Sequence, residues 1–127
     1  MTDKPSDQES IKETVQNYFR GMYHSDTDRL EKAFHPDAHL HGHYKGTLVD
    51  IPLQNWLGMV KKTPAPADNG EEYDMKIVSI DITGDAAIVK VADLYTGLKF
   101  TDYLSLMKID EQWLIVNKTF YHEPSSK

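Results

Sequence analysis

Three histidines at alternate positions, His39, His41 and His43, are the first residues of this sequence whose type and spacing suggest chemistry. In a strand all three would point to one side, because successive strand residues alternate between faces. Imidazoles at positions i and i+2 can ligate one metal ion. An imidazole in a pocket can instead act as a general base or contact a ligand. The remaining interpretation is that some of the three are exposed residues at a sheet edge.

Two aspartates, Asp93 and Asp102, fall among apolar residues in stretches that alternate like strands. A carboxyl on an apolar face is costly to ionise, so its pKa should rise. A carboxylic acid that stays protonated can donate a hydrogen bond to a developing oxyanion. The alternative for Asp102 is a structural role, as hydrogen-bond acceptor for a tyrosine or a backbone N–H.

The rest of the sequence describes the domain that must position these residues. Its 127 residues, 39% of them hydrophobic, suffice for one packed domain over residues 1–127, with an ordered core at about 10–122. The net charge of −6, without a basic cluster, argues against nucleic-acid and anionic-membrane partners. The absence of cysteine excludes disulfides and thiol catalysis. No signal peptide or membrane span is visible, so we expect a cytoplasmic domain.

Apolar residues at helical spacing predict three helices in the first half. Ser10 and Glu13 have the spacing of a capping box that starts the first helix, which ends at residues 24–26. A short second helix precedes Pro36, and a strand is expected at 38–44. Asp50 and Pro52 open the third helix, whose buried face includes Trp56. Residues 63–72 predict a mobile loop.

Four strands are predicted in the second half, joined by two-residue turns at Gly84-Asp85, Thr96-Gly97 and Glu111-Gln112. Their predicted ranges are Tyr73–Thr83, Ala86–Tyr95, Leu98–Asp110 and Trp113–His122. Turn length sets the register of a hairpin and therefore which residues share a face. This register places Val91 opposite Asp102, Asp93 opposite Phe100, and Asp102 opposite Tyr121.

The register also sorts the strands into two faces. One face holds most branched aliphatic residues together with Asp93, Asp102, Asn117 and Tyr121, and we expect the helices to cover it. The other face holds Lys118 and is still too apolar for open water, which predicts a homodimer through it. The alternative is a tolerated surface, interrupted by Lys90, Thr101 and Lys118.

Two stretches carry a resemblance to a known family. They are Phe34-His35-Pro36-Asp37-Ala38 with Gly42 and Gly46, and Thr101-Asp102-Tyr103-Leu104 continuing to Lys118. The sequence resembles the nuclear transport factor 2-like (NTF2-like) superfamily, in the branch labelled putative lumazine-binding, close to the SnoaL-like polyketide cyclases. The resemblance implies an α+β fold of three N-terminal helices packed on a curved, mainly antiparallel sheet. Such a fold forms a cone with an internal pocket.

Ketosteroid isomerase has the same fold, and comparison with it implies roles for individual residues. Its oxyanion tyrosine falls at Tyr18 and its protonated oxyanion aspartate at Asp102. Its general-base aspartate falls near Gly42, so that His41 or His43 would have to substitute. This departure argues against steroid isomerisation and leaves proton transfer on another carbonyl compound.

These observations predict a pocket for a small apolar or aromatic molecule, with acid–base chemistry of isomerase, cyclase or dehydratase type and no cofactor or bound metal. Tyr18 and Asp102 would hold the oxyanion, and His41 would move the proton. The residues expected to contact the ligand are His39, Trp56, Asp93, Asn117 and Tyr121. The alternative is a non-catalytic ligand-binding or protein-interaction module. A third interpretation is a metal hydrolase that uses His39 and His41.

Overall fold

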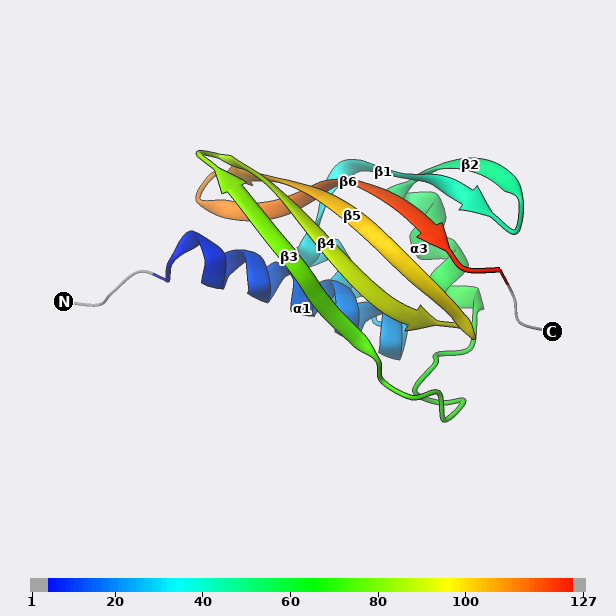
Figure 1. Ribbon diagram of the computed structural model, residues 1–127. Helices are drawn as coiled ribbons and strands as arrows, with labels where there is room; N and C mark the ends of the chain where they lie inside the picture. Colours follow the sequence, from blue (N-terminus) through cyan, green and yellow to red (C-terminus); the bar gives the residue numbers. More distant parts are fainter. Residues whose placement is uncertain (1–4, 125–127) are drawn as a thin grey trace.

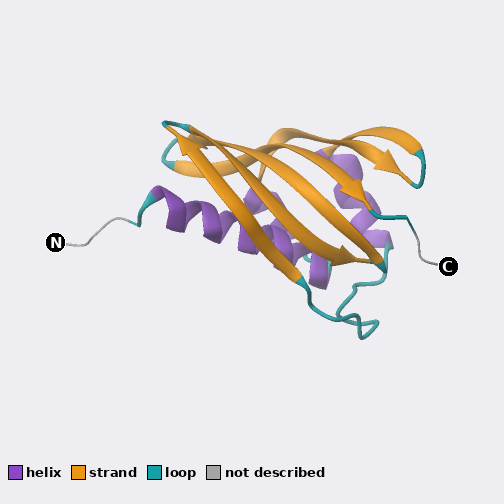
Figure 2. Cartoon of the chain, in the orientation of Figure 1, coloured by secondary structure: helices purple, strands orange, loops and turns teal. Residues whose placement is uncertain are grey.

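The computed structural model describes residues 5–124 and confirms the predicted α+β class. Three helices pack against one face of a curved, six-stranded sheet that does not close into a barrel (Figures 1 and 2). No helix among the described residues is long and apolar enough to cross a membrane. The elements in chain order are α1 (Asp7–His24), α2 (Thr27–Ala33), β1 (Phe34–Tyr44), β2 (Thr47–Pro52), α3 (Leu53–Lys62), β3 (Met75–Thr83), β4 (Ala86–Tyr95), β5 (Leu98–Ile109) and β6 (Gln112–His122).

Helix α1 begins one turn earlier than predicted. Ser6 is its N-cap, and a capping box joins Ser6 to Glu9 rather than Ser10 to Glu13. The Glu9 N–H donates to Ser6 Oγ at 3.1 Å, and the Ser6 N–H donates to Glu9 Oε1 at 2.9 Å. Both serine–glutamate pairs have the required spacing, but only the earlier start adds a helical turn that contacts the sheet.

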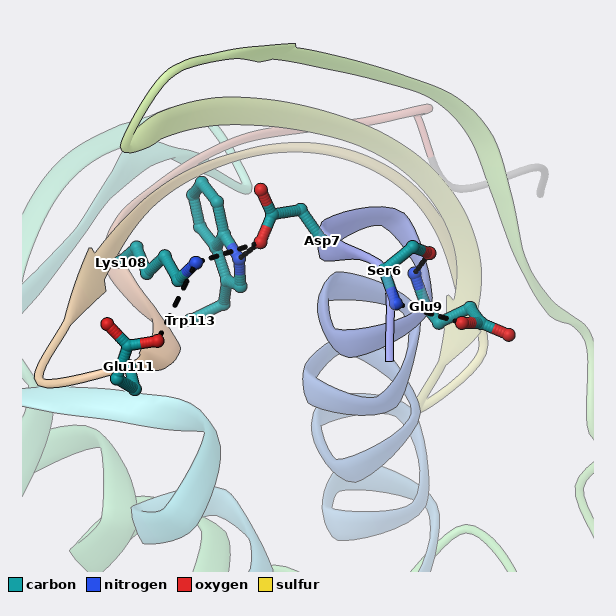
Figure 3. A network of polar contacts seen from close by, with 6 residues as sticks. All are labelled: Ser6, Asp7, Glu9, Lys108, Glu111 and Trp113. Carbon is teal, nitrogen blue, oxygen red and sulfur yellow. Dashed lines mark hydrogen bonds and ion pairs between the residues drawn. The ribbon is translucent and has the colours of Figure 1, made fainter. Parts of the chain in front are cut away.

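That extra turn fastens α1 to the hairpin between β5 and β6 (Figure 3). The Asp7 carboxylate accepts hydrogen bonds from Trp113 Nε1 at 3.1 Å and Lys108 Nζ at 3.2 Å. These two hydrogen bonds lower the pKa of Asp7. Lys108 Nζ also lies 3.9 Å from a Glu111 carboxylate oxygen. The start of the helix that carries Tyr18 is therefore held against the sheet by side-chain contacts.

The sheet has the strand order β2-β1-β6-β5-β4-β3, in which β1 and β6 are parallel and the other neighbours are antiparallel. Strand β2 was not predicted, because Asp50 and Pro52 were assigned to the start of the third helix. A tight turn at Lys45 and Gly46, with φ of 50° and 86°, instead folds β2 back on β1. Strand β1 also begins at Phe34, four residues before the predicted start at Ala38.

The β4–β5 register agrees with the prediction, with Val91 opposite Asp102 and Asp93 opposite Phe100. The β5–β6 register does not, because Asp102 lies opposite Phe120 instead of Tyr121. The turn is at Asp110-Glu111, and β6 contains an extra residue between Ile115 and Asn117.

An irregularity of this kind reverses which side chains face the core beyond it. Lys118, predicted on the uncovered face, is therefore buried on the helix side with 6% of its surface exposed. Tyr121, predicted to be inside, is 60% exposed. A similar irregularity between Ile77 and Ser79 leaves Val78 exposed and turns Met75 inward, against prediction.

Candidate functional site

A cavity of about 370 Å³ lies between the helices and the sheet. Its walls come from α1, α3 and every strand except β3. Most of the lining is aliphatic or aromatic, including Leu40, Trp56, Phe100 and Phe120. Cavities that hold drug-sized ligands range from about 300 to 1,000 Å³, so this one suits a small molecule. Trp56, which we predicted to contact the ligand, is part of the wall.

Asp93, on β4, is the carboxyl group that lines this cavity. Only 4% of its surface is exposed. Burial raises the pKa of Asp93 well above its ordinary value of 3.8, the nearby charge of Asp102 raises it further, and Lys118 opposes the shift. The sequence-based prediction of a raised pKa at Asp93 therefore agrees with the structure.

Asp93 and Asp102 form a buried carboxyl pair. The nearby charge of Asp102 and the contact between the two side chains both raise the pKa of Asp93, which favours the protonated form of Asp93. Asp93 Oδ2 and Asp102 Oδ1 are buried and have no hydrogen-bond partner within residues 5–124. Two buried carboxylates in contact cannot both ionise easily. A proton on Asp93 therefore relieves the repulsion between the two carboxyl groups.

Tyr18 stands behind this pair. Its hydroxyl donates to Asp102 Oδ2 at 2.6 Å, and both residues are completely buried. Burial and the neighbouring Asp102 raise the pKa of Tyr18 well above 10.0, so the hydroxyl keeps its proton. The chain of contacts from the cavity inward is Asp93, Asp102 and Tyr18. The predicted Tyr18–Asp102 proximity is present, but neither residue belongs to the cavity wall.

Lys118 is a buried lysine that lines the same cavity, whereas the predicted register puts it on the uncovered face. Its Nζ lies 4.9 Å from the centre of the Trp56 ring, 5.0 Å from that of Tyr18 and 5.6 Å from that of Phe120. Aromatic faces attract a cation, so the three rings help to hold Lys118 Nζ at this position. No hydrogen bond or ion pair engages this ammonium group in the described part of the chain. Its N–H donors are available to a molecule in the cavity.

Gly42 explains how Phe120 reaches this position. A Cβ at residue 42 would lie 2.6 Å from the Phe120 carbonyl oxygen and 2.8 Å from its ring. Strands β1 and β6 thus approach closely where Gly42 and Phe120 are neighbours in the parallel register. The Phe120 ring therefore lies directly beside Gly42, where it lines the cavity next to Lys118.

The four remaining predicted site residues on β1 and β6 lie on the other face of the sheet. Leu40 points into the cavity, so His39 and His41, its neighbours on β1, point away from it. Asn117 contacts His41 there, with its amide 3.0 Å from the imidazole Nδ1. His41 therefore does not meet Tyr18 or Asp102, contrary to the predicted catalytic arrangement. Tyr121 is likewise outside the cavity wall.

Tyr95 was not singled out from the sequence, although it lines the cavity beside Asp93. Burial, with the nearby charge of Glu71, raises the pKa of Tyr95 to about 12. Glu71 accepts hydrogen bonds from the Thr96 and Gly97 N–H groups at 2.9 and 2.7 Å. The loop predicted to be mobile is thus attached to the β4–β5 turn at the cavity.

Comparisons with known proteins agree with this fold. A family described as "Putative lumazine-binding" matches residues 6–121. NTF2-like proteins of unknown function from Methylobacillus flagellatus and Shewanella baltica superpose with a TM-score of 0.82 each and are 29% and 28% identical. The superposition with the Methylobacillus protein covers 98% of this chain and 99% of that protein. The superposition with the Shewanella protein covers 97% of this chain and 100% of that protein. The chain belongs to the putative lumazine-binding family of the NTF2-like superfamily.

One similar protein carries the name of an enzyme. It is "Aldolase FrzH" from Cladobotryum sp., which is 27% identical over 121 residues, or 94% of each chain.

Proposed function

We propose that this chain binds a small, mainly apolar or aromatic carbonyl compound and catalyses proton transfer beside the carbonyl without a cofactor. The observation that carries the proposal is that Asp93 and Lys118 meet in one apolar cavity. A carboxyl pair with a raised pKa suits a general base, because proton transfer is most efficient when the pKa of the base is near the working pH. An ammonium group without a partner suits a developing oxyanion.

In the proposed reaction the ligand places its carbonyl oxygen against Lys118 Nζ and an adjacent C–H bond against Asp93. The proposal requires that Asp93 and Asp102 together hold one proton, so that Asp93 accepts the carbon-bound proton as the first proton moves onto Asp102. The carboxyl pair becomes neutral, and the negative charge moves to the enolate oxygen beside the ammonium group. Tyr18 acts through Asp102 as a positioning residue.

An enolate formed in this way can attack a second carbonyl carbon and form a carbon–carbon bond. The proton held by the carboxyl pair then returns to the new alkoxide oxygen. This is the step of an aldol reaction, and the name of the Cladobotryum relative supports this reaction class. The family description supports a small-molecule ligand.

A two-stage experiment tests the proposal. A thermal-shift screen compares aromatic ketones and aldehydes with the corresponding alcohols, and includes lumazine; a ligand of the folded state raises the melting temperature. Each binding compound is then incubated with protein in D₂O, and exchange of the protons beside its carbonyl is followed by NMR.

Wild-type protein should accelerate this exchange, and Asp93→Asn should slow it by a factor on the order of 10²–10⁴. Asp81→Asn, which makes the same change at an exposed residue of β3, is the matched control and should leave the rate unchanged. Equal rates in wild type and Asp93→Asn would refute the assignment of Asp93 as the base.

The second candidate function is a non-catalytic ligand carrier. The hydrogen bond between Tyr18 and Asp102 favours it, because the Tyr18 hydroxyl and Asp102 Oδ2 are already paired with each other inside the scaffold. A carrier binds compounds in the thermal-shift screen but accelerates no proton exchange in any of them.

We also propose that the chain is a homodimer through the uncovered face of the sheet. Ile88, Tyr103 and Met107 expose 44%, 42% and 46% of their surfaces there. Ile88 is on β4, and Tyr103 and Met107 are on the neighbouring strand β5. Sedimentation equilibrium should give twice the chain mass for wild type and the single chain mass for the double variant Ile88→Asp/Met107→Asp. A monomeric wild type at micromolar concentration would contradict the proposal.

A further inference from the structure

A cluster of two histidines and an aspartate lies on the uncovered face of the sheet, on β1 and β2. His39 and His41 are on the same side of β1, and Asp50 is the direct neighbour of His41 across the antiparallel pair. Asp50 Oδ1 lies 2.7 Å from His39 Nδ1 and 3.2 Å from His41 Nε2. The two imidazoles are stacked, with centroids 5.9 Å apart and planes within 16° of each other. One carboxylate oxygen therefore faces both rings.

The spacing of these groups is that of metal ligands. One ligand atom from each of the three residues lies within 4.8 Å of the other two. Metal–nitrogen and metal–oxygen bonds of about 2.0–2.2 Å place neighbouring ligands of a tetrahedral zinc ion about 3.4 Å apart. Small side-chain rotations therefore suffice to surround one ion. All three side chains are partly exposed, so an ion can enter from solvent.

A second layer on β6 supports one of the ligands. The Asn117 amide lies 3.0 Å from His41 Nδ1, and Thr119 Oγ1 lies 3.2 Å from the same amide. Asn117 Nδ2 faces the ring and Oδ1 accepts from Thr119 Oγ1. A half-turn of the amide would place its oxygen against the ring, where it accepts from His41 Nδ1–H and leaves the Nε2 lone pair for a metal. Metal-bound histidines usually have such a partner on the other ring nitrogen. Asn117 and Thr119 are the register neighbours of His39 and His41, so the arrangement follows from the sheet itself.

We propose that His39, His41 and Asp50 bind one divalent transition-metal ion of the zinc type. Two imidazoles with one carboxylate suit zinc and its neighbours, whereas calcium and magnesium prefer oxygen ligands alone. Three protein ligands leave a fourth position for water, a small anion or a substrate. The site lies on the opposite side of the sheet from the cavity and is independent of the function proposed for it.

Isothermal titration of Zn²⁺ into untagged, EDTA-treated protein near neutral pH tests this site. Wild type should bind one equivalent, and His39→Ala and Asp50→Asn should each weaken binding at least about tenfold. Asn117→Ala should weaken it by about tenfold through its contact with His41. His43→Ala is the matched control, since it removes an exposed imidazole from the same side of the same strand and should keep the wild-type affinity.

Thermal melting of each variant without metal confirms that it is folded. A wild-type dissociation constant weaker than about 1 mM would overturn the proposal. Equal loss of affinity in His43→Ala and His39→Ala would also overturn it, because binding would then depend only on the number of surface histidines.

Discussion

The two faces of the sheet carry the same kinds of side chain in different surroundings. The helix-covered face has Asp93, Lys118 and, from α1, Tyr18, all buried. The uncovered face has an exposed aspartate, Asp50. It also has a lysine on β4, Lys90, whose Nζ lies 5.7 Å from the centre of the Tyr103 ring on β5. The chemistry available to each face therefore depends on burial more than on residue type.

The two aspartates show this most clearly. Burial removes water from Asp93 and raises its pKa, whereas hydrogen bonding to His39 and the proximity of His41 lower the pKa of Asp50. Asp93 is thus prepared to exchange a proton with a ligand. Asp50 stays a carboxylate over a wider pH range, which is the form that binds a cation.

The largest expected effect concerns the two lysines. Lys118→Met removes the ammonium group from the cavity and should lower the rate of ligand proton exchange by a factor on the order of 10²–10³, as for loss of an oxyanion donor. Lys90→Met removes a similar cation–aromatic contact from the uncovered face and should leave the rate within about twofold, because surface changes have small effects. NMR exchange rates measure both variants. Comparable losses in the two would show that the cavity ammonium has no special role.

The tyrosines give the next contrast. Tyr18→Phe leaves Asp102 without its buried donor and should cost about 2 kcal/mol of unfolding free energy, the range for a hydrogen bond to a charged group. Tyr103→Phe changes a partly exposed tyrosine and should cost less than about 0.5 kcal/mol. Urea unfolding at neutral pH measures both. An equal cost for the two substitutions would mean that Asp102 does not depend on the Tyr18 hydroxyl.

The effect of pH on stability distinguishes the two aspartates in sign. Between pH 3.8 and the raised folded-state pKa of Asp93, the unfolded chain has lost the Asp93 proton and the folded chain retains it. Stability from this group therefore falls as pH rises through that window. The stability of wild type relative to Asp93→Asn should decline as the pH is raised above about 4.

Urea unfolding at a series of pH values measures this difference. Asp50→Asn provides the comparison: because the folded pKa of Asp50 is lowered, wild type should lose its advantage over this variant as the pH falls. A constant difference between wild type and Asp93→Asn at all pH values would contradict a raised pKa at Asp93.

Much of the fold could be predicted because it is encoded locally. The helical spacing of apolar residues gave α1, α2 and α3, and two-residue turns gave the β4–β5 register that brings Asp93 and Asp102 together. Tyr18 was placed correctly on the buried side of α1, where it reaches Asp102.

The errors in the predicted site arise from irregularities that no local pattern announces. One extra residue in β6 moved Lys118 into the cavity and Asn117 and Tyr121 out of it. The missed strand β2 concealed that Asp50 meets His39 and His41. The side to which the histidines point depends on how β1 pairs with β6, a contact between residues about 78 positions apart. A lysine among apolar strand residues was the one available signal for Lys118.

Asp93 keeps its proton at the cavity to a higher pH than an ordinary aspartate, whereas Asp50 on the other face loses its proton at a lower pH. Carbon-13 NMR of the aspartate carboxyl groups, assigned with Asp93→Asn and Asp50→Asn, measures both across a pH titration. The account predicts that the Asp93 carboxyl still reports a protonated form well above pH 3.8, and that Asp50 titrates below this value. An Asp93 signal that titrates at 3.8 or lower would contradict it.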